Sequence, residues 1–152
     1  MALPDAMSAC AMCVEVMVGG TTFTDYSDEV SVVDAPGLAR MSADAYVFGE
    51  DTALIGYGKR EPGEVTIRGV YVDTTTSLFY LANGAFTTAC GALFAVRYSP
   101  GGCTTAHRSL RTSTTVAKIV NLTPPSGDAG SADILMWEAT IKTPDITEAT
   151  WA

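Results

Sequence analysis

Alternating apolar and polar positions predict that most of this chain folds as β-strands. The clearest example runs from Glu64 to Asp73, where Val65 and Ile67 share one face of an extended segment. A period of two residues is typical of a strand, because successive side chains point to opposite faces. The same period runs from Arg40 to Phe48, where both faces are occupied. Shorter patterns of this kind predict further strands at residues 14–18, 22–26, 93–98, 116–122 and 132–143.

The period changes only once, between the strand patterns at 64–73 and 93–98. Leu78, Leu81 and Ala82 are spaced at i, i+3 and i+4, which is the spacing of one helix face. The hydroxyl-rich segment 74–77 precedes them and offers side chains that cap a helix N-terminus. Asn83 and Gly84 are residues that commonly end a helix. We therefore expect one short helix that stops near residue 84.

These patterns favour a mainly β fold with a single domain. No linker, internal repeat or low-complexity tract divides the sequence. The expected architecture is a β-sandwich or open barrel of about six to eight strands with one flanking α-helix. Residues 14–152 would form this domain, and residues 1–13, which show no clean period, would form an N-terminal arm.

The segment 49–63 has the composition of a long loop with an apolar centre. It contains four glycines and a proline, and Leu54, Ile55 and Tyr57 lie in its middle, followed by Lys59 and Arg60. A long loop of this kind is usually functional. The alternative is that the loop folds back on its own domain.

The composition suggests that part of the surface is covered by partners. Of 152 residues, 47% are hydrophobic and only 17% are charged, whereas soluble domains carry about 25% charged residues. No stretch approaches the roughly 18 apolar residues of a spanning helix, and the N-terminus lacks the basic region of a signal peptide. We expect no membrane association, and instead a large interface with other protein subunits.

The formal net charge of −8 argues against binding to nucleic acid. Affinity for phosphate backbones comes mainly from lysine and arginine, which are few here. Two interpretations of the acidity remain open. It serves solubility, or it keeps a surface near DNA or a membrane from adhering.

The four cysteines do not by themselves define a metal or redox site. Cys10 and Cys13 have the CxxC spacing of metal knuckles and thiol oxidoreductases. A zinc site needs two further ligands, and Cys103 with His107 is the only other pair. The βαβ context of a redox motif is missing, so we favour reduced thiols that act as small apolar side chains. Cys90 has no partner by spacing. We expect no metal and no cofactor.

The sequence also offers no set of residues that would support catalysis. The single histidine, His107, has no nucleophile or orienting carboxylate placed near it by the sequence. Asp25, Asp28 and Glu29 cluster in a predicted turn but lack the spacing of a calcium loop. The glycines at 56 and 58 match neither a dinucleotide nor a phosphate-binding loop. We therefore expect that the protein is not an enzyme.

The order of turns and strands resembles a known family. Gly20-Thr-Thr-Phe-Thr-Asp-Tyr-Ser-Asp-Glu-Val30 is followed by Ser31-Val-Val-Asp-Ala-Pro-Gly37, a strand and the glycine-rich segment. Glu61-Pro-Gly-Glu-Val-Thr-Ile-Arg-Gly-Val-Tyr71 comes next, and the chain closes with Thr143-Pro-Asp-Ile-Thr-Glu-Ala-Thr-Trp151. From about residue 19 onward the chain resembles the major tail (tail tube) proteins of phages with long, non-contractile tails. The cysteine-bearing N-terminus has no counterpart in this resemblance.

The resemblance implies a structural role in a virion. Such proteins form hexameric rings that stack into a tube, through which the genome DNA passes without specific binding. Tape measure and tail terminator proteins would be partners, and the chain would be made in the cytoplasm of the bacterial host. An acidic lumen suits DNA release, and Asp44, Glu64 and Asp73 are the candidates to face it. Candidates for contact with an adjacent ring are Leu54, Ile55, Tyr57, Lys59 and Arg60.

Two other classes of protein share these patterns. A tail terminator or a capsid decoration protein would carry the same strand signals but would form a single ring or a trimer. A sugar-binding β-sandwich would need an aromatic platform, which Tyr46, Phe48 and Tyr57 would supply.

Overall fold

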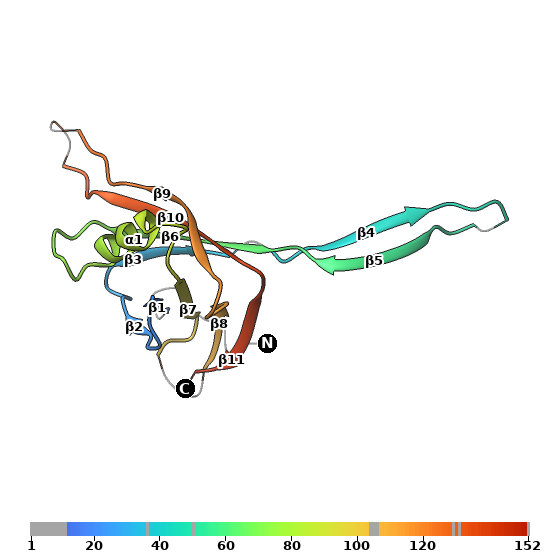
Figure 1. The fold of residues 1–152 in the computed structure, drawn as a ribbon, viewed down its shortest axis with the longest axis horizontal. Helices are drawn as coiled ribbons and strands as arrows, with labels where there is room; N and C mark the ends of the chain where they lie inside the picture. The colour runs from blue at the N-terminus through green and yellow to red at the C-terminus, as the bar shows by residue number, and fades with distance from the viewer. Residues whose placement is uncertain are drawn as a thin grey trace, which may run out of the picture.

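The computed structural model describes residues 12–35, 37–49, 51–103, 107–128, 130 and 132–151. These residues form eleven strands and one helix, which confirms the mainly β fold with a single flanking helix (Figure 1). The strands are β1 (Cys13–Val18), β2 (Thr24–Asp25), β3 (Val30–Asp34), β4 (Arg40–Ala45), β5 (Leu54–Arg60), β6 (Gly63–Val70), β7 (Phe94–Ser99), β8 (Arg108–Thr112), β9 (Lys118–Thr123), β10 (Met136–Thr143) and β11 (Ile146–Thr150). The helix α1 (Leu78–Thr87) lies between β6 and β7 in the chain.

The strands form two sheets and a separate hairpin. One sheet has the order β11-β8-β7-β1-β2, and the other has the order β3-β6-β10-β9. β4 and β5 pair with each other in a third, two-stranded sheet. Figure 1 shows this hairpin extending far from the body of the molecule, as a continuation of the segments that lead from β3 and into β6.

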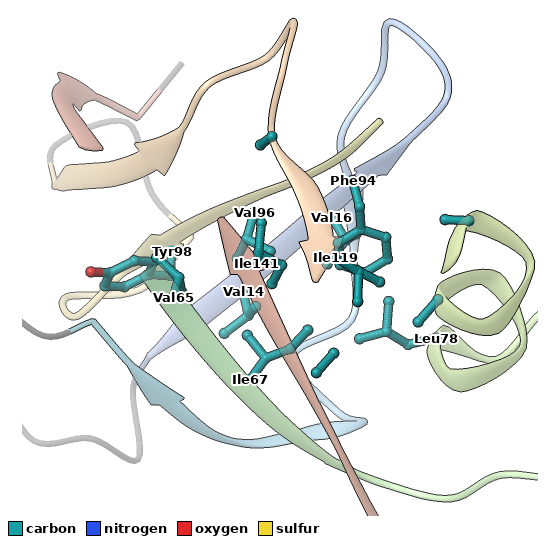
Figure 2. Packing of buried hydrophobic residues seen from close by; sticks show 14 of the residues in the cluster. Val14, Val16, Val65, Ile67, Leu78, Phe94, Val96, Tyr98, Ile119 and Ile141 are labelled. Atoms are coloured by element: carbon teal, nitrogen blue, oxygen red, sulfur yellow. The ribbon is translucent and has the colours of Figure 1, made fainter. Parts of the chain in front are cut away.

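The core lies between the two sheets and is closed at one side by the helix. In β6 and β10 every second residue is buried, as the two-residue period predicted. Val65, Ile67 and Ile141 meet Val14, Val16, Phe94 and Val96 of the other sheet (Figure 2). Tyr98 lies at the edge of this cluster, and burial raises the pKa of its phenol above the ordinary value of 10.0.

The helix begins where the hydroxyl-rich segment predicted it. Ser77 is the N-cap, and its side chain accepts a hydrogen bond from the Tyr80 backbone N–H. The carboxylate of Glu29 accepts a second bond, from the Leu78 N–H at 2.7 Å, and so satisfies another free donor of the first turn. No helix within the described residues is long and apolar enough to cross a membrane.

The predicted end of the helix at Gly84 was wrong, because α1 continues to Thr87. Ala85 is buried against the core, which favours one more helical turn. The Thr88 N–H and hydroxyl both bond to the Gly84 carbonyl, and Thr88 ends the helix with φ −61°. A threonine cap thus replaces the left-handed glycine that the sequence suggested.

Strands β3, β5, β8 and β11 were not predicted, so the strand number exceeds the expected six to eight. In β8, two buried side chains, Ser109 and Thr112, are polar. The Ser109 hydroxyl donates to the Ala149 carbonyl, and the Thr112 hydroxyl accepts from the Val96 N–H. These bonds allow polar residues to occupy buried positions, so the apolar alternation that marks a strand is missing there.

The cysteines differ from the expectation of reduced thiols. Cys13 and Cys103 form a disulfide with a Cα–Cα distance of 5.2 Å, which joins the start of β1 to the turn after β7. Cys90 is free and exposed. The CxxC partner Cys10 lies outside the described residues, as does most of the predicted N-terminal arm.

Candidate assembly interface

The β4–β5 hairpin presents its side chains to solvent along its whole length. Every residue of both strands is exposed. Asp44 pairs with Ile55, Ala45 with Leu54 and Ser42 with Tyr57, and a bulge follows toward the base of the hairpin. Because no residue of either strand is covered, both faces of the hairpin are available to another surface. Such contact would also stabilise the element, since an isolated two-stranded hairpin is marginally stable in water.

The two faces of the hairpin differ in chemistry. Directly opposed residues of an antiparallel pair share one face. Ser42, Asp44, Ile55 and Tyr57 therefore lie on one side, which combines a carboxylate with large apolar groups. The other side carries small residues, including Ala43, Ala45 and Gly56, with Leu54 near the tip.

The tip of the hairpin adds further apolar side chains. Tyr46 is 83% exposed, Phe48 is fully exposed, and Val47 lies between them. Monomeric proteins rarely expose contiguous apolar groups on this scale, and such patches mark interaction sites. The exposed large apolar residues of the hairpin are Met41, Tyr46, Val47, Phe48, Leu54, Ile55 and Tyr57.

Hydrogen bonds join the two strands at the base of the hairpin, and one ion pair joins the hairpin to the body. The Glu61 N–H donates to the Ala39 carbonyl at 2.9 Å, and the Arg40 guanidinium donates to the Gly58 carbonyl at 3.0 Å. Arg60 lies 3.8 Å from the Asp145 carboxylate. Only residues 61 and 62 separate β5 from β6, which enters the core directly. The direction of the hairpin is thus set by a buried strand.

The expectation that residues 49–63 form a loop was wrong for residues 54–60, which form β5. The five residues that we predicted to contact an adjacent ring all lie on β5, from Leu54 to Arg60. The glycine content concealed this strand, because glycine weakens strand patterns. A larger residue at position 58 would crowd the opposite strand, since a Cβ at Gly58 would lie 3.0 Å from the Met41 Cβ.

The three acidic residues predicted to face a lumen occupy different parts of the structure. Asp44 lies on the hairpin, beside Ile55. Glu64 lies on the exposed face of β6, with its carboxylate 3.9 Å from the Lys142 amino group. Asp73 follows the end of β6, and its carboxylate accepts a 3.4 Å hydrogen bond from Tyr71. The structure therefore brings Asp44 together with two predicted ring-contact residues rather than with the other acids.

Sequence reasoning missed a second apolar surface, on the body near the base of the hairpin. Val116 and Val120 are both half exposed there. With Pro62 and Pro144 they line a shallow hollow of about 400 Å³, which Lys118 and Lys142 also border. The expected strand at 116–122 contained both valines, but the pattern alone did not reveal that they stay uncovered.

The predicted aromatic platform for sugar binding is divided between two parts of the hairpin. Tyr46 and Phe48 lie beyond the end of β4, and Tyr57 lies within β5 opposite Ser42. All three side chains are exposed.

Comparison with solved structures places this fold among tail and injection-system proteins. A chain of the extended sheath–tube complex of an extracellular contractile injection system, PVC, aligns with a TM-score of 0.70 and 18% identity, over 97% of this chain and 94% of that one. A chain of the anti-feeding prophage baseplate aligns with a TM-score of 0.73 and 14% identity, over 99% and 98%. A chain of a gene transfer agent tail aligns with a TM-score of 0.66 and 11% identity, over 97% and 100%.

This chain has their fold. No protein-family model matches the sequence, and no characterised protein matches it by sequence. The alignments span nearly the whole of each chain.

Proposed function

We propose that this protein is the structural subunit of a phage-type tail tube, built from stacked hexameric rings through which DNA passes. The observation that carries the proposal is the β4–β5 hairpin, whose apolar side chains are exposed in the single chain. Burying them against neighbouring copies would remove this surface from water. The role is structural, with no catalytic step, and the site of action is the virion.

The related folds support a sixfold ring. The matched baseplate is described as 6-fold symmetrised, and the matched gene transfer agent tail as having C6 symmetry. A closed ring uses one head-to-tail interface repeatedly and leaves its two faces free to stack. It also covers exposed strand edges, which otherwise favour uncontrolled pairing.

The finer parts of the proposal rest on the sequence resemblance. These are a long, non-contractile tail, the tape measure and terminator partners, and synthesis in the bacterial cytoplasm. Some of the matched folds come from contractile injection systems. Electron microscopy of intact particles tests whether the tail is contractile, because a contractile tail carries a sheath around its tube.

A second copy of the chain offers a complementary surface for the hairpin. The hollow beside Val116 and Val120 is apolar and bordered by Lys118 and Lys142. On the hairpin, Ile55 and Tyr57 are large, exposed apolar side chains. Apolar contact between the hairpin and this hollow would supply most of the free energy of association.

Acidic residues suit the proposed passage of DNA. Asp44, Glu64 and Asp73 remain our candidates for lining the lumen, where carboxylates repel phosphate and limit adhesion. Asp44 is the first choice for a test, because it lies on the projecting hairpin, whereas Glu64 lies beside the Lys142 amino group.

Negative-stain electron microscopy of the purified full chain at rising concentration tests the proposal. We expect long striated tubes from the wild type and only small species from Ile55→Asp, since moving the new carboxylate from water into the interface is costly. Tyr80→Asp is the matched control, because Tyr80 is an exposed aromatic on α1, away from the hairpin. Monomers at every concentration, or tubes from Ile55→Asp, would contradict the proposal.

A tube terminator is the second candidate function. Chains of the PVC sheath/tube terminator and of the anti-feeding prophage cap align with TM-scores of 0.72 and 0.71. A terminator would give discrete single rings in the same micrographs, which distinguishes it from a tube-forming subunit.

A further inference from the structure

Three potential metal ligands from separate segments meet at one end of the β1–β7 sheet. They are Cys13 at the start of β1, Asp25 at the end of β2 and Cys103 in the turn after β7. One ligand atom from each lies within 4.8 Å of the other two. This convergence does not depend on the proposed tail function.

The Asp25 carboxylate is oriented like a metal ligand. Its Oδ1 accepts a 2.9 Å hydrogen bond from the Ser27 N–H, which leaves Oδ2 directed toward Cys103 Sγ at 3.9 Å. The Ser27 hydroxyl also lies 3.6 Å from Cys13 Sγ. Outer hydrogen bonds of this kind fix the orientation of ligating side chains in metal sites.

We propose that the reduced chain binds Zn²⁺ through Cys13, Cys103 and Asp25, and that the disulfide is the oxidised, metal-free state of this site. A thiol or phosphine reductant supplies two electrons, two protons come from water, and the disulfide becomes two thiols. Zinc binding then releases both protons and joins the metal to two thiolates. Two sulfurs and a carboxylate form a ligand set that zinc accepts in tetrahedral geometry.

The surrounding backbone allows the change of geometry that zinc requires. Two thiolates bound to zinc at about 2.3 Å lie roughly 3.8 Å apart, farther than in a disulfide. Cys13 is held in β1, paired with Ser99. Cys103 is exposed and follows Gly101 and Gly102, the latter with φ +109°. The cysteine on this glycine-containing turn is therefore the one that would move.

Water would complete the tetrahedral coordination of the zinc ion as its fourth ligand.

The test uses the full chain, reduced with a phosphine, freed of reductant and mixed with zinc in the absence of oxygen. After gel filtration, elemental analysis should show zinc retained by the wild type and by the control Cys90→Ser. Competition with a chromophoric chelator should show at least tenfold weaker binding for Cys103→Ser and Asp25→Asn. Cobalt in place of zinc should give thiolate-to-metal charge-transfer absorption, and the oxidised chain should bind neither metal.

Two results would overturn the inference. One is the absence of retained zinc in the reduced wild type while its circular dichroism stays that of the folded chain. The other is unchanged affinity in Cys103→Ser and in Asp25→Asn. Asp25 is exposed, so its amide variant should fold and keeps the test valid if a cysteine variant does not.

Discussion

At the scale of single residues, Arg97 shows how charge is stabilised on the face of the β1–β7 sheet that points away from the core. It pairs with Glu15, directly opposite on β1, and the two side chains are only 16% and 15% exposed. Its guanidinium carbon also lies over the rings of Phe23 and Trp151, at 4.7 and 4.3 Å from the ring centroids. The Trp151 side chain is buried in this contact.

Replacing Arg97 with alanine should destabilise the fold by about 2–4 kcal/mol, because it leaves the Glu15 carboxylate mostly buried without its partner. Urea unfolding followed by circular dichroism measures this change. Arg108→Ala is the matched control, since Arg108 and Glu148 form an exposed pair with side chains 80% and 51% exposed. Arg108→Ala should lower the free energy of unfolding by less than about 0.5 kcal/mol. Equal losses in the two variants would contradict the argument.

At the scale of elements, the pairing of β6 with β10 depends on one glycine. Gly69 lies directly opposite Trp137, and a Cβ at Gly69 would lie 2.9 Å from the Trp137 indole nitrogen and 2.8 Å from the Glu29 carbonyl oxygen. The indole N–H donates to the Val70 carbonyl at 3.2 Å. The absence of a side chain at 69 therefore makes room for the largest side chain of the core.

Gly69→Ala should destabilise the protein by about 1–3 kcal/mol through overpacking. Gly84→Ala should act in the opposite direction, because Gly84 lies in α1 with nothing within 4 Å of an added Cβ. The gain there is about 0.5–1 kcal/mol, from the higher helix propensity of alanine. Thermal unfolding of both variants beside the wild type measures the two shifts. A stabilised Gly69→Ala would show that the indole can move aside.

At the scale of the whole molecule, the structure joins a packed body to a projecting hairpin (Figure 1). The body buries its apolar residues between two sheets and a helix. Every residue of the two hairpin strands is exposed, so few side chains protect their backbone hydrogen bonds from water. Local opening is easiest where buried apolar contacts are few.

Hydrogen exchange should therefore be fast in β4 and β5 of the free chain and slow in β6 and β10. In assembled tubes the hairpin amides should become protected, as neighbouring copies cover them. Mass spectrometry of peptides from both states measures this difference, and the β6 and β10 peptides serve as the internal reference. Equal protection of the hairpin in the two states would argue against its role in assembly.

The sequence by itself determined the elements that can be recognised from the pattern of neighbouring residues. Alternation identified β1, β6 and β10, and the hydroxyls before Leu78 identified the start of α1. These signals are readable because a buried face imposes its period on the chain. The low charge and the apolar residues between Gly49 and Gly63 also indicated an interaction surface.

The tertiary structure decided what depends on contacts between distant segments. It made residues 54–60 a strand, because pairing with β4 stabilises a glycine-containing segment that has no buried face of its own. It allowed Ser109 and Thr112 in a buried strand, because partner backbones satisfy their hydroxyls. It also brought Cys13, Asp25 and Cys103 together, although 90 residues separate the two cysteines. Such proximity is set by the packing of the strands in space, which local sequence patterns do not encode.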